Sequence, residues 1–396
     1  MGAEISGPSA DSKKAKLVLI VAGEASADLH GSHLVRAIKK MDPNVSFWGI
    51  GGKKMEEAGV KILVPSSDMA VVGLTEVLTR VPVITKAYFQ LRSILRKNRP
   101  DLLILIDYPD FNISLAGSAK RLNIPVLYYI GPQVWAWRRG RVRKLARRVD
   151  RMAVILPFEE DFYRERGMAV EYVGHPLLDS VPRDENKGEI IRALGLESGG
   201  PILGLLPGSR REEVVNLLPS MIQAAEILHS RHPGLKALLP LASTIPPDLV
   251  DALISRSRVE IKVLQGDIYK ILTACDLALV ASGTATLETA IMGVPMVILY
   301  KVSPLSYWIG RLVIKVPHIG LVNLVAGRQI VPELIQGEVR PEKIAQEALA
   351  ILEGRQVREN MIKDLRGLKE RLGRGPASEK TAEIALQMMA KQEAAS

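Results

Sequence analysis

The tripeptide Gly208-Ser209-Arg210 has the residue types that bind the phosphates of a nucleotide. It follows the apolar run 201–206 and precedes a helical pattern. Backbone N–H groups at a helix N-terminus, a hydroxyl and a guanidinium are the donors that a diphosphate needs. Ordinary turn chemistry followed by an N-cap serine would explain the same residues. Taken alone, this segment leaves both interpretations open.

A second segment favours the nucleotide interpretation. Another apolar run is followed by Ser282, Gly283 and Thr284, and Glu288 comes one helical turn later. Small residues at a helix N-terminus admit a phosphate, and a carboxylate at this depth accepts hydrogen bonds from both hydroxyls of a ribose. A capping glutamate is the alternative, but it explains neither the Ser-Gly-Thr tract nor the Gly-Val-Pro that ends the helix.

Asp107 is the candidate general base. It ends the apolar run 102–107, and Tyr108 and Phe111 follow it closely. We expect these aromatic rings to desolvate the carboxyl group and raise its pKa, as a base working near neutral pH requires. Asp110 has a simpler explanation, since it stands where it would cap the next helix.

The first apolar run leads into Gly23, Glu24 and Ser26, which are placed to meet a substrate. The segment lacks the Gly-x-Gly-x-x-Gly pattern, so a dinucleotide fingerprint is absent. His30 and His33 follow, but with no third ligand nearby we expect them on a helix surface. No metal and no cofactor are predicted.

The fold must place these residues where strands end and helices begin. Short apolar runs and helical patterns alternate along the whole chain, which predicts two parallel, doubly wound α/β sheets that bind ligands at the carboxyl ends of their strands. The expected strands are 16–22, 45–50, 60–64, 102–107, 125–130, 151–156, 170–173, 201–206, 236–240, 259–264, 277–281 and 296–300. The expected helices are 29–41, 84–98, 112–122, 159–167, 211–232, 247–255, 267–274 and 284–292.

The same pattern, together with local composition, divides the chain into four parts. Residues 1–15 are polar and predict a disordered leader without the apolar segment of a signal peptide. One Rossmann-like domain is expected over 16–185, and a second, which carries the nucleotide segments described above, over 186–345. Residues 346–396 predict helices, and their return to the first domain is left open.

Composition narrows the class of protein. The chain has 396 residues, of which 47% are hydrophobic, enough for two cores. Cys275 is its single cysteine, so no intramolecular disulfide forms and a reducing, cytoplasmic compartment is expected. No run of 18 apolar residues predicts a spanning helix.

The positive charge behind the net charge of +10 is concentrated in residues 138–151. Such a cluster can meet the phosphates of nucleotides, anionic lipid or nucleic acid. With 5% aromatic residues and no recognisable binding module, nucleic acid is not expected as a partner. Eight basic residues against one acid make up the cluster: Arg138, Arg139, Arg141, Arg143, Lys144, Arg147, Arg148 and Arg151.

Seven motifs, in order over about residues 16 to 390, resemble the lipid-A-disaccharide synthase family. Ala27 stands where many relatives have glycine, and Tyr108 where alanine is frequent; neither changes a charged group. The motifs are Ala-Gly-Glu-Ala-Ser-Ala-Asp at 22–28, Ile-Asp-Tyr-Pro-Asp-Phe-Asn at 106–112, Pro-Gln-Val-Trp-Ala-Trp-Arg at 132–138, Leu-Pro-Phe-Glu at 156–159, Val-Gly-His-Pro at 173–176, Leu-Pro-Gly-Ser-Arg at 206–210 and Ala-Ser-Gly-Thr-Ala-Thr-Leu-Glu at 281–288.

This resemblance implies a metal-independent, inverting glycosyltransferase with two Rossmann-like domains facing a cleft, the GT-B type. It implies transfer of 2,3-diacylglucosamine from its UDP derivative to the 6-hydroxyl of 2,3-diacylglucosamine 1-phosphate. Asp107 would be the base, and Arg210 would stabilise departing UDP. Glu288 would hold the ribose, Asn323 would lie near the diphosphate, and Glu24 would line the acceptor side. The domain over 16–185 would hold the acceptor, and the domain over 186–345 would hold UDP.

Acyl chains need apolar surface, which the sequence offers at 69–91 and 302–314, although core packing explains part of both. With the basic cluster, these segments suggest peripheral attachment to the anionic inner membrane surface. A homodimer is left open. A polyprenyl-linked glycosyltransferase or a nucleotide-sugar 2-epimerase is the alternative function.

Overall fold

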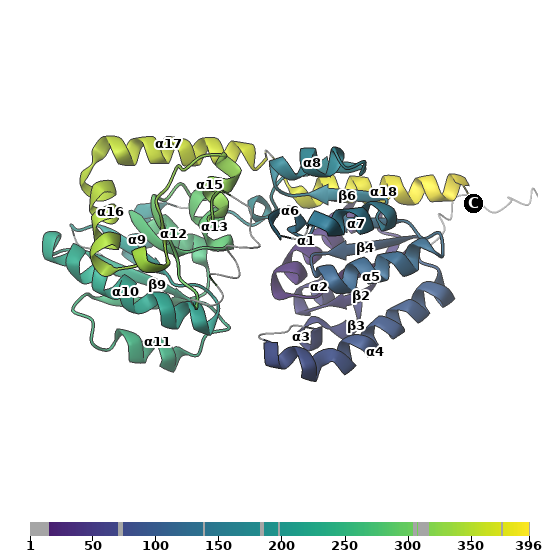
Figure 1. The fold of residues 1–396 in the computed structure, drawn as a ribbon, viewed down its shortest axis with the longest axis horizontal. Coiled ribbons are helices and arrows are strands. Elements are labelled where there is room, and N and C mark those ends of the chain that lie inside the picture. Colours follow the sequence, from purple (N-terminus) through teal and green to yellow (C-terminus); the bar gives the residue numbers. More distant parts are fainter. Residues whose placement is uncertain are drawn as a thin grey trace, which may run out of the picture. The chain divides into compact units, whose positions relative to one another are not determined.

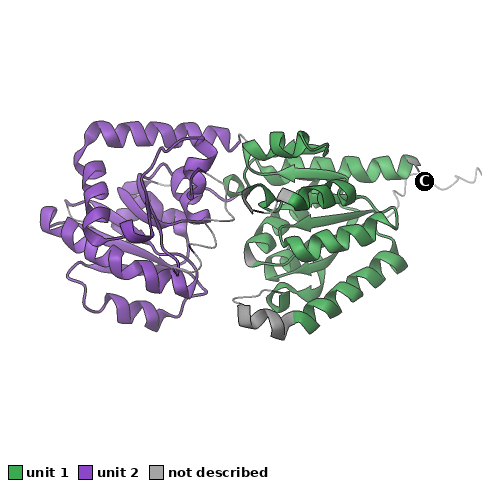
Figure 2. Cartoon of the chain, in the orientation of Figure 1, with its two compact units in different colours: residues 1–179, 375–396 green, residues 180–374 purple. Residues whose placement is uncertain are grey.

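The computed structural model describes residues 16–69, 74–137, 139–182, 186–196, 199–303, 307, 317–373 and 375–395. The chain forms two compact units (Figure 2). Unit 1 comprises Met1–Asp179 and Gly375–Ser396, and unit 2 comprises Ser180–Arg374. The expected leader, residues 1–15, lies outside the described residues, as do Arg138 and most of the 302–314 segment.

Unit 1 is built on a seven-stranded sheet with the order β3-β2-β1-β4-β5-β6-β7, and every neighbouring pair is parallel. This is the doubly wound arrangement that the sequence predicts. β4 is buried along its whole length, as its run of Leu and Ile residues requires. The strands are β1 (Lys16–Ala22), β2 (Val45–Gly51), β3 (Val60–Pro65), β4 (Leu102–Ile106), β5 (Val126–Tyr129), β6 (Arg151–Val154) and β7 (Val170–Tyr172).

Alternate residues of β1 enter two separate cores of unit 1. Val18 and Ile20 pack with α1 (Ala25–Met41), α2 (Lys53–Glu57) and α18 (Ala377–Ala395). Leu19 and Val21 pack on the other face of the sheet, under α4 (Leu74–Asn98), α5 (Pro109–Lys120) and α7 (Val142–Arg148). Figure 1 shows these two helical layers. The remaining elements of unit 1 are α3 (Ser66–Met69), α4 (Leu74–Asn98), α5 (Pro109–Lys120), α6 (Val134–Trp137), η1 (Arg139–Arg141), α7 (Val142–Arg148), α8 (Pro157–Arg164) and η2 (Pro176–Asp179).

Unit 2 repeats the plan with a six-stranded parallel sheet of order β10-β9-β8-β11-β12-β13. Its strands are β8 (Ile202–Leu206), β9 (Lys236–Leu241), β10 (Ile261–Gln265), β11 (Leu277–Ala281), β12 (Met296–Tyr300) and β13 (Glu333–Ile335). Its helical elements are α9 (Lys187–Ala193), α10 (Arg211–Arg231), α11 (Pro247–Ile254), α12 (Ile268–Ala274), α13 (Thr284–Ile291), α15 (Leu321–Ala326), η3 (Gln336–Glu338), α16 (Pro341–Glu353) and α17 (Arg355–Arg371).

Each sheet reverses its winding direction beside its first strand, between β1 and β4 in unit 1 and between β8 and β11 in unit 2. At such a point the following helices diverge, which leaves a crevice at the carboxyl ends of the two strands. At the amino ends of each of these two strand pairs, an aspartate side chain accepts a hydrogen bond from the neighbouring strand. Asp101 accepts the N–H of Leu17 at 2.8 Å, and Asp276 accepts the N–H of Ile202 at 2.9 Å.

The expected strands are all present, but β13 was not predicted, because three residues are too few for a periodic pattern. α1 starts at Ala25 instead of residue 29, and α5 starts at Pro109 instead of 112. The first turn of α1 carries small or polar residues, which hide the apolar period, and α5 begins with Pro109 and Asp110, residues that also favour turns. α4 begins ten residues before the prediction and continues through Pro82, a residue that normally marks a boundary.

Candidate active site

The loop after β8 is tight and already holds a carboxylate. Gly208 has φ +110°, and a Cβ there would lie 2.2 Å from Glu213 Oε2. The N–H groups of Ser209 and Arg210 donate to that same oxygen at 3.1 and 3.2 Å. Thr244 holds the loop from the other side, because its hydroxyl donates to the Ser209 carbonyl at 2.6 Å. Only glycine fits position 208.

Two of the amide groups that the sequence offers to a diphosphate are therefore bound to Glu213. This glutamate is the third residue of α10, where it caps the helix start and faces its positive end. The Arg210 side chain is 74% exposed and only loosely paired with Glu213 at 3.5 Å, so it remains available to a ligand. Sequence reasoning missed Glu213, although its spacing from Arg210 is that of a capping box.

Most of the residues predicted to bind the nucleotide surround one cavity of about 360 Å³ in unit 2. Glu288 projects from α13 into this lining, and burial raises the pKa of its carboxyl group. Tyr269 hydrogen-bonds Glu288, a partner that the sequence pattern did not reveal. The predicted residues that line the cavity are Gly208, Ser209, Arg210, Ser282, Gly283, Thr284 and Glu288.

Asn323, the other residue expected near the nucleotide, is not among the residues lining this cavity. It is fully buried on α15, and its amide NH₂ donates to the Val331 carbonyl and to Glu333 at 2.9 and 2.7 Å. Its carbonyl oxygen accepts the N–H groups of Ile330 and Val331 at 2.7 and 3.0 Å. These contacts make Asn323 an anchor for the segment that leads into β13.

The carboxyl end of β4 in unit 1 has an unusual backbone. Asp107 and Tyr108 have φ values of +46° and +47°, which non-glycine residues rarely adopt. The carbonyl of Asp107 accepts hydrogen bonds from the Asn112 amide at 2.7 Å and the Tyr128 hydroxyl at 2.5 Å. These buried partners compensate the strain and fix the direction of Asp107. Strain maintained in this way is typical of functional sites.

Asp107 has the raised pKa that its surroundings in the sequence suggested. Burial and then the charge of Glu24 raise the pKa of Asp107 to about 6, while the N–H of Tyr108 lowers it. Gly23 brings β1 close: a Cβ there would lie 2.6 Å from the Tyr108 ring. Gly23, Glu24 and Asp107 therefore lie together at the reversal of the sheet, and Ser26 is exposed in the first turn of α1.

A buried glutamate fixes the segment that carries the Trp-Ala-Trp-Arg motif. Trp135 donates its Nε1–H to Glu159 at 2.9 Å and packs edge-on against Phe158. Glu159 also accepts the N–H groups of Ile155 and Leu156 at 3.3 and 3.0 Å. Burial raises the pKa of Glu159 to about 7. Glu159 lies in one of the seven motifs, yet the sequence did not indicate this partnership.

The expectation that His30 and His33 lie on a helix surface is wrong. Both side chains are partly buried on α1, and in the described residues their Nδ1 atoms are buried without a hydrogen-bond partner. Burial, helped by the neighbouring His33 and Lys54, lowers the pKa of His30 to about 4. The described residues contain no group of three or more His, Cys, Asp or Glu side chains that could hold a metal ion.

Comparisons with known proteins cover nearly the whole chain. A family model described as lipid-A-disaccharide synthetase matches residues 18–388. The lipid-A-disaccharide synthase of Geobacter sulfurreducens is 49% identical over 95% of this chain and 98% of its own length. That of Syntrophus aciditrophicus is 50% identical, again over 95% of this chain and 98% of its own length.

Solved structures share the fold at low sequence identity. The UDP-GlcNAc 2-epimerase of Neisseria meningitidis, bound to UDP-GlcNAc, has a TM-score of 0.62 and 14% identity over 94% of this chain and all of its own. A glycosyltransferase from Rickettsia africae has a TM-score of 0.61 and 13% identity over 95% of this chain and 99% of its own. They confirm the predicted class, two Rossmann-like domains of the GT-B type.

The pKa of Asp107 gives a direct test of the geometry in unit 1. We expect Glu24→Gln to lower this pKa below its value near 6, because removing a neighbouring negative charge makes the carboxyl group easier to ionise. The measurement is a carboxyl-carbon NMR titration. Glu56→Gln, an exposed carboxylate on α2, is the control. Equal titrations in the two variants would contradict the arrangement.

Proposed function

The chain belongs to the lipid-A-disaccharide synthetase family, and from this premise we propose the reaction that it performs. It moves 2,3-diacylglucosamine from its UDP derivative to the 6-hydroxyl of 2,3-diacylglucosamine 1-phosphate. The products are UDP and a β-1,6-linked disaccharide. The observation that carries this proposal is the convergence of the Gly208–Arg210 loop and Glu288 on one cavity at the sheet reversal of unit 2.

The donor's UDP is assigned to this cavity. The N-terminal end of α13 offers the backbone N–H groups of Gly283 and Thr284 to the diphosphate, whereas the Ser282 N–H already donates to the Leu299 carbonyl at 2.9 Å. Glu288 accepts the ribose hydroxyls, and Tyr269 orients its carboxylate. Because Glu213 already occupies two amides of the Gly208–Arg210 loop, the diphosphate either displaces that carboxylate or uses the guanidinium of Arg210.

The acceptor is assigned to unit 1, beside Gly23, Glu24 and Ser26. Asp107 takes the proton from the 6-hydroxyl as that oxygen attacks the anomeric carbon of the donor. A pKa near 6 suits the task, because the group is mostly ionised at neutral pH and still basic enough to accept a proton. The backbone held by Asn112 and Tyr128 keeps the carboxyl group in place.

The bond between the anomeric carbon and the UDP oxygen breaks as the new bond forms, so negative charge grows on the diphosphate. Arg210 is placed to stabilise this charge, since its guanidinium is exposed in the donor cavity. Arg210 supplies the positive charge that a divalent cation supplies in other transferases, and the proposal includes no metal.

A nucleotide-sugar 2-epimerase shares this fold, as the Neisseria structure shows, but it is 14% identical. The relatives that are about half identical over almost their full length are lipid-A-disaccharide synthases. Identity of that extent favours the transferase reaction over the epimerase and the polyprenyl-linked alternative.

We also propose that the protein works in the cytoplasm on the anionic inner membrane surface, with unit 1 in contact. No helix among the described residues is long and apolar enough to cross a membrane. In the basic cluster, Arg141 pairs with Asp110 and Arg148 binds the Ile113 carbonyl. Arg143, Lys144 and Arg147 are exposed on α7, and exposed Val81, Val83 and Phe89 lie on α4, which covers the same face of the sheet. Basic and apolar groups together bind such surfaces.

Product analysis tests the reaction. With UDP-diacylglucosamine, acceptor and a chelator present, the protein should form disaccharide and UDP, and the acyl-free donor should be a poor substrate. We expect Asp107→Asn to lower turnover about 10²- to 10⁴-fold, because general base catalysis is lost, while UDP binding stays normal. Asp110→Asn, an exposed neighbour, should retain most activity. Full activity of Asp107→Asn, or epimerisation without acceptor, would overturn the proposal.

Arg210→Ala separates leaving-group stabilisation from nucleotide binding. We expect turnover to fall about 10²- to 10³-fold, as on loss of one preorganised donor to a developing charge, with a much smaller change in UDP affinity. Steady-state kinetics and calorimetry measure the two effects. Arg211→Ala, the exposed neighbour outside the cavity lining, is the matched control. Equal losses of turnover and UDP affinity would assign Arg210 to binding alone.

Vesicle sedimentation tests the membrane proposal. Binding to anionic vesicles should weaken as salt rises, and it should fall further on reversal of Arg143, Lys144 and Arg147 to Glu, since these cations lose their attraction to the lipid phosphates. Binding that is insensitive to salt would contradict the proposal. The control reverses three exposed lysines on helices of the opposite face of the sheet: Lys40, Lys53 and Lys391.

A further inference from the structure

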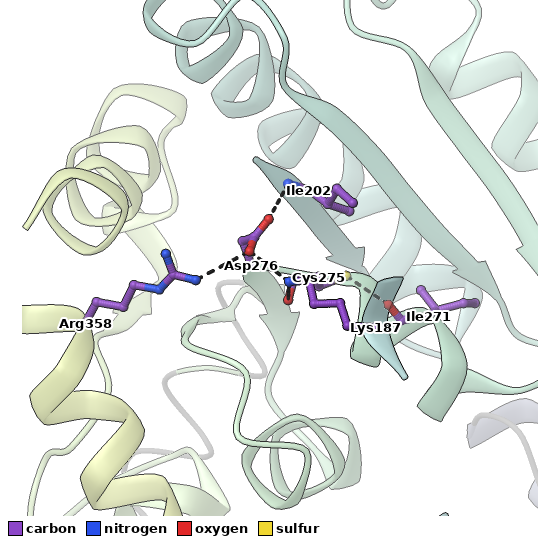
Figure 3. A network of polar contacts seen from close by, with 6 residues as sticks. All are labelled: Lys187, Ile202, Ile271, Cys275, Asp276 and Arg358. Atoms are coloured by element: carbon purple, nitrogen blue, oxygen red, sulfur yellow. Dashed lines mark hydrogen bonds and ion pairs between the residues drawn. The ribbon is translucent and has the colours of Figure 1, made fainter. Parts of the chain in front are cut away.

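A second cavity of unit 2, of about 350 Å³, lies at the opposite end of the central strands from the donor cavity. Figure 3 shows the polar network on its wall. Asp276 accepts the N–H of Ile202 with one oxygen, and its other oxygen faces Lys187 Nζ at 2.8 Å and Arg358 Nη2 at 3.4 Å. Lys187 also donates to the Cys275 carbonyl at 3.2 Å.

The two cavities are separate. Asp276 precedes β11 and Ile202 begins β8, whereas the donor cavity begins where these strands end, at Leu206 and Ala281. Each strand has five residues, which span roughly 13 Å at the rise of a parallel strand. A ligand in the second cavity therefore does not occupy the donor site.

One face of α17 extends this cavity into a trough. Arg358, Ile362 and Lys369 line it, and an adjoining cavity of about 220 Å³ adds Arg366. The spacing of these four residues is that of neighbours along one side of a helix. The opposite wall is the segment 291–293, which lines both cavities. We call this region the α17 trough.

The residues that line the α17 trough carry more positive than negative charge. Asp276 is the only acid among the described lining residues, and Lys187 and the Ile202 N–H already satisfy it. Arg358 lies 3.4 Å from Asp276, longer than the 2.7–2.9 Å usual between charged partners, so its donors are not fully used. Within the described part of the chain, the side chains of Arg366 and Lys369 have no hydrogen bond or ion pair.

A structural role accounts for Lys187 and Asp276, which tie α9 to the start of β8 and β11, but not for Arg366 and Lys369. α17 is held on unit 2 by a different face, formed by buried Met361, Leu365 and Leu368. The two cations add nothing to that packing. They are exposed at the rim of a cavity that already carries Arg358.

We propose that the α17 trough binds a phosphate-bearing anion with an apolar part. Arg358 offers planar, paired donors to phosphate oxygens, and Lys369 and Arg366 neutralise the remaining charge. The apolar part lies against Ile291, Met292 and Ile362. A soluble phosphate ester or a lipid headgroup has this chemistry.

Such a ligand would touch both connections of unit 2. Val181 and Pro182 line the cavity just after the chain enters unit 2 at residue 180, and Lys369 lines it shortly before the chain leaves at 374. Occupancy therefore restrains the two segments through which unit 2 is attached. This effect does not depend on the donor cavity being empty.

Calorimetry with inorganic pyrophosphate tests the site, with saturating UDP present to keep the donor cavity filled. We expect one pyrophosphate site in the wild-type chain and at least tenfold weaker binding in Arg366→Ala/Lys369→Ala. The matched control, Arg355→Ala/Lys363→Ala, removes the same charge from the same helix outside the trough and should change binding less than twofold. Circular dichroism verifies that both variants fold, and UDP binding verifies that the donor cavity is intact. No pyrophosphate site under UDP, or equal weakening in the two variants, overturns the proposal.

Two further titrations distinguish the sources of the phosphate. Glycerol 3-phosphate represents soluble esters, and phosphatidylglycerol vesicles, compared with phosphatidylcholine vesicles, represent lipid. Binding that depends on Arg366 and Lys369 in the first titration assigns a soluble ligand, and dependence only in the second assigns a lipid headgroup. Independence of these two residues in both titrations contradicts the proposal.

Discussion

The pairing of two parallel strands at the point of reversal is the constraint on which both halves of this protein depend. In unit 1 it joins β1 to β4, and in unit 2 it joins β8 to β11. A carboxylate, Asp101 or Asp276, fixes the entry of each pair. Register at the entry determines which residues emerge at the exit, so a partly buried aspartate at one edge helps to position the side chains at the other.

The central strand pairs of the two units have the same arrangement, but the side chains at their carboxyl ends differ in the charge that they favour. At the exit of β4, burial and Glu24 oppose ionisation of Asp107, so the site holds a proton more readily than a free carboxyl group. At the exits of β8 and β11, helix ends and Arg210 attract negative charge, and Glu213 provides some of it before any ligand arrives. The base and the anion-binding site that we propose thus arise from one fold through the side chains placed at equivalent exits.

Apolar periodicity was sufficient to predict the strands and their winding, because each strand is a separate short run between turn residues. Because loops that follow adjacent strands must meet, it also explains why Gly208–Arg210 and Ser282–Glu288 line one cavity of unit 2, although Asn323 does not line it. Apolar periodicity did not predict contacts between segments that are distant in the sequence. Nothing in the spacing of Asn323, Glu159 or His30 shows that tertiary neighbours saturate the first two and bury the third. The short β13 lacks enough residues to give any pattern.

The last helix has a consequence for how the chain is made. α18 contributes Ile384, Ala385 and Met389 to the core formed by α1 and β1, yet residues 180–374, the whole of unit 2, are synthesised between them. At 5–20 residues per second that interval lasts about 10–40 s. During it the first unit leaves the ribosome with an apolar face uncovered, whereas the second unit can fold as soon as it emerges. The half that begins first is therefore completed last, and its apolar face stays uncovered until α18 has been made.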